Sequence, residues 1–130
     1  MRKLKIISLL AILLSSCAEY KSQEMVIDGE KKKVLVADNY FAKVEGIRPF
    51  EKQPKGEYDG LLFIVKPDTA FTTSGMENYL LICSLAKAKV GYKTVNCKCL
   101  EPDIDEYYPN SAYVYERLFS DKDCKNQIKL

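Results

Sequence analysis

The segment at residues 32–45, KKVLVADNYFAKVE, decides the fold class that we expect from the sequence. Lys32–Ala37 places two valines on one face of a strand, and the Asp-Asn turn signal at 38–39 ends it. Tyr40–Glu45 then places three apolar residues on one face, as a returning strand does. With Met25–Asp28 as a preceding strand, this part of the chain predicts a meander of three antiparallel strands.

The rest of the chain predicts further strands and one helix. The strands are expected at Leu61–Val65, Tyr92–Leu100 and Ser111–Phe119. The helix is expected to begin at Ser74-x-x-Glu77, which matches a capping box, and its apolar stripe continues at helical spacing to Ala86. We therefore expect a mainly β fold with one α-helix, a small five-stranded OB-like barrel stapled by disulfides. The apolar run at 61–65 is the part that does not fit such a barrel.

The N-terminus has the three-part pattern of a secretory signal peptide. A basic region is followed by Ile6–Leu14, nine residues in which only Ser8 is polar, and then by two small serines. A helix needs roughly 20 apolar residues to cross a bilayer, so this run is too short to span one. We expect residues 1–16 to be a signal peptide that is removed.

Leu14-Ser15-Ser16-Cys17 closes this segment and resembles the bacterial lipobox. The resemblance implies cleavage before Cys17, a diacylglycerol on its thiol and an acyl chain such as palmitate on the new amino group. Several acyl chains hold a protein on a bilayer where one would not. The ordinary alternative is a signal peptide with a chance cysteine at its cleavage site.

The expected organisation is a signal peptide at 1–16, a lipidated tether at 17–24 and a single OB-like domain at 25–130. The expected location is the cell envelope. Ala18 follows the cysteine, whereas an aspartate at that position commonly retains Gram-negative lipoproteins in the inner membrane. Its absence favours the outer membrane, facing the periplasm.

The charge balance disfavours nucleic acid as a partner. The whole chain has 20 basic and 18 acidic residues, and three of the basic ones lie in the signal peptide. The mature chain therefore has 17 basic and 18 acidic residues, a net charge of −1. A protein that binds phosphates usually carries a basic excess. The chain also contains no histidine, which excludes histidine-based catalysis and common metal sites.

Four cysteines remain once Cys17 is assigned to lipid: Cys83, Cys97, Cys99 and Cys124. An even number in an exported domain predicts two disulfides. A zinc site is the alternative, but the spacing and the lack of histidine fit it poorly, and we expect no metal or cofactor. Cys97 and Cys99 are not expected to pair with each other, because next-but-one strand residues fit disulfide geometry badly. Of the two remaining pairings, Cys97–Cys124 with Cys83–Cys99 is slightly preferred.

Four short motifs follow one another between residues 25 and 118. They are Val26-Ile27-Asp28-Gly29-Glu30, Val44-Glu45-Gly46-Ile47 with Glu51, Gly75-Met76-Glu77 with Tyr79-Leu80, and Asp105-x-Tyr107 with Ala112-x-Val114. Their order and spacing resemble the staphylococcal-nuclease (thermonuclease) family. That resemblance implies an OB fold and a calcium-dependent phosphodiesterase.

The catalytic set that this family uses is incomplete here. The family needs two carboxylates on calcium, a glutamate near the attacking water and two arginines on the phosphate. Only Glu51 is kept. Glu30 is a tolerable residue at the first carboxylate position, but Arg48 stands at the second carboxylate position, Lys43 at the first arginine and Pro109 at the second arginine. An arginine's two-pronged grip on phosphate is lost with lysine. Glu30, Lys43 and Glu51 are thus vestigial candidates only, and we expect no active nuclease.

Three functions follow as hypotheses. The first is a non-catalytic binding or scaffold module that docks another envelope protein, for example in a secretion or conjugation apparatus. Tyrosines in and before the last predicted strand suit such an interface. They are Tyr107, Tyr108, Tyr113 and Tyr115. The alternative is that they are half-buried strand residues with a structural role only. The second is a residual phosphodiesterase. The third is an inhibitor of a secreted enzyme, for which the acidic loop Glu101–Asn110 is the candidate segment.

Overall fold

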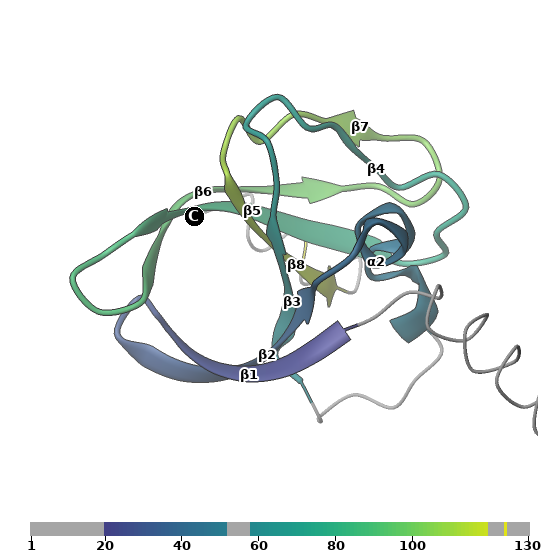
Figure 1. The fold of residues 1–130 in the computed structure, drawn as a ribbon. Helices are drawn as coiled ribbons and strands as arrows, with labels where there is room; N and C mark the ends of the chain where they lie inside the picture. The colour runs from purple at the N-terminus through teal and green to yellow at the C-terminus, as the bar shows by residue number, and fades with distance from the viewer. Residues whose placement is uncertain (1–19, 52–57, 120–123, 125–130) are drawn as a thin grey trace, which may run out of the picture.

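Strands dominate the part of the chain that the structure describes (Figure 1). The computed structural model describes residues 20–51, 58–119 and 124. The strands are β1 Tyr20–Ile27, β2 Glu30–Ala37, β3 Gly60–Ile64, β4 Phe71–Thr72, β5 Tyr79–Lys87, β6 Tyr92–Leu100, β7 Glu106–Tyr107 and β8 Tyr113–Phe119. The helical segments are α2 Tyr40–Glu45 and the 3-10 turn η1 Arg48–Phe50. The predicted mainly β class is confirmed.

Six of these strands form a ring of hydrogen-bonded neighbours, in the order β1-β2-β3-β8-β5-β6. β2 and β3 run parallel, while the other long ladders are antiparallel. The ring closes where Ile27 of β1 meets Tyr92 of β6, and the Asp28 backbone N–H donates to the Tyr92 carbonyl oxygen at 2.9 Å. β4 and β7 form a separate two-stranded sheet.

The central strands bury both of their faces. In β5, Leu80 and Ile82 belong to one apolar cluster, and Leu81 and Leu85 belong to the other. The first cluster includes residues of α2, η1, β4 and β7, and the second includes residues of β1 and β6. Each fully buried leucine or isoleucine contributes about 1.5–3 kcal/mol. The ring is therefore stabilised by apolar burial on both sides.

The helix predicted from Ser74 to Ala86 is wrong, because residues 79–87 form strand β5. A strand that is covered on both faces needs apolar residues at almost every position. Such a run also satisfies helical spacing, so the pattern alone cannot separate the two structures. The capping-box motif instead lies in a turn, where the Met76 N–H donates to the Thr73 carbonyl oxygen at 2.8 Å.

The strand predicted at Tyr40–Glu45 is also wrong, because these residues form α2. Asn39 caps the helix, and its side-chain oxygen accepts from the Ala42 backbone N–H at 2.9 Å. Gly46 ends the helix with a φ of 60°, a conformation that favours glycine. The Asp-Asn pair therefore starts a helix rather than a hairpin turn.

The observed topology differs from the expected five-stranded OB-like arrangement. The ring has six strands, and the helix α2 lies before β3 rather than at residues 74–86, where the sequence predicts a helix. The apolar run predicted at Leu61–Val65 is the ring strand β3, which pairs with both β2 and β8. β1 begins at Tyr20, so the tether expected to extend to residue 24 overlaps a strand in full register with β2.

Two disulfides join the four cysteines in pairs, Cys83–Cys97 and Cys99–Cys124. The prediction of two disulfides is confirmed, but the preferred pairing is wrong. Cys83 and Cys97 lie directly opposite each other on β5 and β6, with Cα atoms 4.1 Å apart, whereas Cys99 lies opposite Leu81. Strand register therefore selects the partner of Cys83 and leaves Cys99 to reach Cys124.

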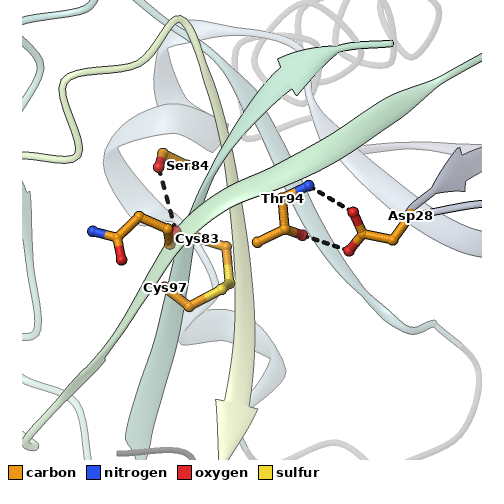
Figure 2. Close-up of a disulfide and its surroundings, with 6 residues drawn as sticks. Asp28, Cys83, Ser84, Thr94 and Cys97 are labelled. Carbon is orange, nitrogen blue, oxygen red and sulfur yellow. Dashed lines mark hydrogen bonds between the residues drawn. A yellow bond between two sulfur atoms is a disulfide. The ribbon is translucent and has the colours of Figure 1, made fainter. Parts of the chain in front are cut away.

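The carboxylate of Asp28 links β1 to β6 where the ring closes, near the Cys83–Cys97 bond (Figure 2). Asp28 accepts hydrogen bonds from the backbone N–H and the hydroxyl of Thr94, both at 2.7 Å. These two bonds lower the pKa of Asp28, because they favour its charged form. Gly91, beside this contact, has a φ of 70° and no room for a Cβ against the Val26 carbonyl group.

Candidate functional site

The most unusual group in the described chain is the carboxyl of Glu116, on β8. Its side chain is 4% exposed, and one of its oxygens, Oε2, has no hydrogen-bond partner. Burial raises the pKa of Glu116 to about 8, although the Arg48 guanidinium and the Ile47 backbone N–H act in the opposite direction. A buried acid of this kind is often part of a functional site, but structural networks produce it too.

The segment that follows α2 covers Glu116. A Cβ placed on Gly46 would lie 3.6 Å from Oε2 of Glu116 and 3.7 Å from the ring of Phe63. The Tyr20 hydroxyl donates to the Gly46 carbonyl oxygen at 2.9 Å. Burial, followed by the charges of Glu45 and Glu116, raises the pKa of Tyr20 to about 12. The first residue of β1 thus holds the end of α2 over the buried carboxyl.

The guanidinium of Arg48 binds backbone carbonyl groups. It donates to three carbonyl oxygens: Thr72 at 2.6 Å, Ser74 at 2.9 Å and Glu45 at 3.2 Å. These bonds tie η1 to the end of α2 and to the loop after β4. A guanidinium engaged in this way has few donors left for a phosphate group.

Glu51, directly after η1, likewise binds backbone groups, in this case of the loop between β4 and β5. Its Oε2 accepts from the backbone N–H groups of Glu77 and Asn78 at 2.8 and 2.9 Å, and from the Asn78 side-chain amide at 2.8 Å. Arg48 and Glu51 line one open hollow of about 320 Å³, together with Pro49, Gly75 and Glu77. Two of the three charged side chains in its wall, Arg48 and Glu51, are thus engaged by the protein's own polar groups.

The structure brings Arg48 and Glu51 together but places Glu30 elsewhere. Glu30 begins β2 at the end far from α2, and its carboxylate lies 3.5 Å from the ammonium of Lys32. At about 3.3 Å per residue, the length of β2 separates Glu30 from Ala37 by roughly 23 Å. Lys43 is exposed on α2, and Pro109 is buried in the connection before β8.

No group of three or more carboxylate, cysteine or histidine side chains is placed to hold a metal ion among the described residues. The arrangement around Arg48 and Glu51 joins loops to one another.

The motifs and apolar patterns of the sequence do not single out Glu116 or Tyr20. A signal for Glu116 is nevertheless present, because it follows Val114 by two positions and so shares the inward face of a predicted strand. An acid on an apolar strand face is a candidate buried group. No comparable signal marks Tyr20, since its partners Ala37, Gly46 and Phe50 lie 17, 26 and 30 positions away in the chain.

A comparison with protein-family models, with curated proteins and with solved structures finds no match to this chain. Among the residues that the structure describes, no helix is long and apolar enough to cross a membrane. The lipobox-like segment, with Cys17, lies outside the described residues.

Proposed function

We propose that this protein is a bacterial envelope lipoprotein, anchored through acyl chains on Cys17, whose β domain is a non-catalytic binding module for another envelope protein. The observation that carries the proposal is the pairing of all four remaining cysteines. Disulfides form and persist in oxidising compartments, which supports export. Cys17 is the fifth cysteine of the sequence, and it stands where a lipobox would place it.

The engaged side chains of Arg48 and Glu51 support a binding role over a catalytic one. The side chains of Arg48 and Glu51 hold backbone groups of neighbouring loops, and Glu30 lies at the other end of β2. A phosphodiesterase needs free charges grouped around one phosphate.

An open strand edge offers the partner a place to bind. β1 pairs with β2 along its whole length, but in the described chain its other edge pairs with β6 only at Ile27. An unpaired edge presents backbone donors and acceptors to an incoming strand. We therefore expect a partner segment to add to β1, on an apparatus that assembles at the membrane.

Replacement of Cys17 by serine is expected to abolish the acylation of the protein. The wild-type protein should incorporate a clickable palmitate analogue and sediment with the envelope fraction, since multiple acyl chains anchor stably. The C17S variant should incorporate none and should not be processed at that position. Label retained in C17S, or no label in the wild type, would refute the anchor.

The partner can be sought with a photo-crosslinking residue on the open edge, at Gln23 of β1, in intact cells. Asp68 is the control position, because it is also exposed but lies in the loop between β3 and β4. We expect a crosslinked protein from the Gln23 position and none from Asp68. Equal crosslinking from both positions, or none from either, would count against a partner on this edge.

A further inference from the structure

The helix α2 has an exposed apolar face. Tyr40, Phe41 and Val44 are 74%, 48% and 60% exposed, while Ala42 on the inner side is fully buried. Positions 40 and 44 are neighbours on a helix, and position 41 adjoins both. The rings of Tyr40 and Phe41 contact each other edge to face at 5.7 Å. These three side chains form one continuous patch, the α2 patch.

The α2 patch lies at the end of the domain where the chain arrives from Cys17. Tyr20 pairs with Ala37, three positions before α2 begins, and its hydroxyl binds Gly46, directly after α2 ends. Both ends of the helix are therefore beside Tyr20. Figure 1 shows α2 next to the start of β1, with the β5–β6 turn at the opposite end of the ring.

The distance from the anchor to the domain is short. Tyr20 follows Cys17 by three residues, and three extended residues span at most about 11 Å. The headgroup zone of a bilayer is itself about 5–8 Å thick on each side. A domain tethered in this way cannot move the start of β1 far from the membrane surface, and α2 is fixed to that start through Tyr20.

We propose that the α2 patch inserts into the headgroup region of the bilayer to which Cys17 is attached. This rests on the proposed lipidation of Cys17. Tyrosine and phenylalanine suit this depth, where apolar rings meet the acyl boundary and a hydroxyl meets water. The charges beside the patch, Lys43 and Glu45, are exposed and of opposite sign, so the contact does not require anionic lipid.

The chain has no tryptophan, so a single introduced tryptophan reports its own environment. Val44→Trp places the probe in the patch, and Val90→Trp is the matched control. Val90 is 68% exposed and lies in the β5–β6 turn, at the far end of the ring. At about 3.3 Å per residue, the length of β1 puts this turn roughly 23 Å from Tyr20.

The mature lipidated variants are reconstituted in phosphatidylethanolamine–phosphatidylglycerol vesicles with or without brominated acyl chains. We expect V44W to show blue-shifted emission and about twofold quenching by the brominated lipid, as for an interfacial side chain. V90W should show neither effect. Y40W repeats the measurement at a position that is already aromatic, in case V44W does not fold by circular dichroism.

Flotation of the same samples distinguishes the lipid anchor on Cys17 from the contact of the α2 patch with the bilayer. A protein that floats with its vesicles while V44W and Y40W remain unquenched would overturn the bilayer contact and leave the anchor intact. Equal quenching of V44W and V90W would overturn it too, because the domain would then have no fixed orientation. A correctly processed protein that does not float would refute the lipid anchor itself.

Discussion

Loss of both disulfides is expected to lower the free energy of unfolding by about 6 kcal/mol, the largest effect of any change considered for this domain. The bonds close loops of 14 and 25 residues. In the chain-entropy account, each loop of this size contributes roughly 3 kcal/mol by restricting the unfolded chain. A domain of this length has a total stability of about 5–15 kcal/mol, so the reduced protein should be largely unfolded or close to it.

Urea unfolding of the mature protein, with and without a strong reductant, measures this effect. The paired variants C83A/C97A and C99A/C124A separate the two bonds. We expect the second pair to cost slightly more, because its loop is longer. Cys83 and Cys124 are buried, so reduction should be carried out under unfolding conditions. An unfolding midpoint that does not change on reduction would contradict the expectation, and the variant lacking all four cysteines controls for effects of the reductant.

Replacement of Glu116 by glutamine is expected to stabilise the domain near pH 8 and to have little effect near pH 5. The pKa of Glu116 is about 8 in the folded protein, whereas the ordinary value is 4.5. Between these two pH values the folded protein therefore binds a proton that the unfolded chain releases. The free energy of unfolding should fall as pH rises through this window, by on the order of 3 kcal/mol between pH 4.5 and pH 7.

Glutamine is neutral at every pH and keeps a carbonyl oxygen for the Ile47 N–H. Denaturant unfolding at several pH values between 5 and 8 should show a falling stability for the wild type and a flatter profile for E116Q. Glu24→Gln is the matched control, because Glu24 is exposed on β1. A wild-type profile without a downward slope, or the same slope in E116Q, would show that Glu116 does not control this dependence.

The candidate site could be predicted from sequence only in part. Arg48 and Glu51 stand close together in the chain, so their shared hollow needs little tertiary information. Their hydrogen-bond partners, near residues 72–78, could not be predicted, because those bonds depend on where β4 and the turn at Met76 come to lie. The same holds for Glu116, whose burial is produced by the segment after α2.

The sequence by itself determined the mainly β class, the position of most strands and the presence of two disulfides. Apolar runs bounded by turn residues, and an even number of cysteines, carry that information locally. The tertiary structure alone decided that residues 79–87 form a strand and that 40–45 form a helix. Burial on both faces removes the alternation that distinguishes strand from helix. The disulfide pairing was decided by strand register, which places Cys83 opposite Cys97 and depends on contacts across the whole ring.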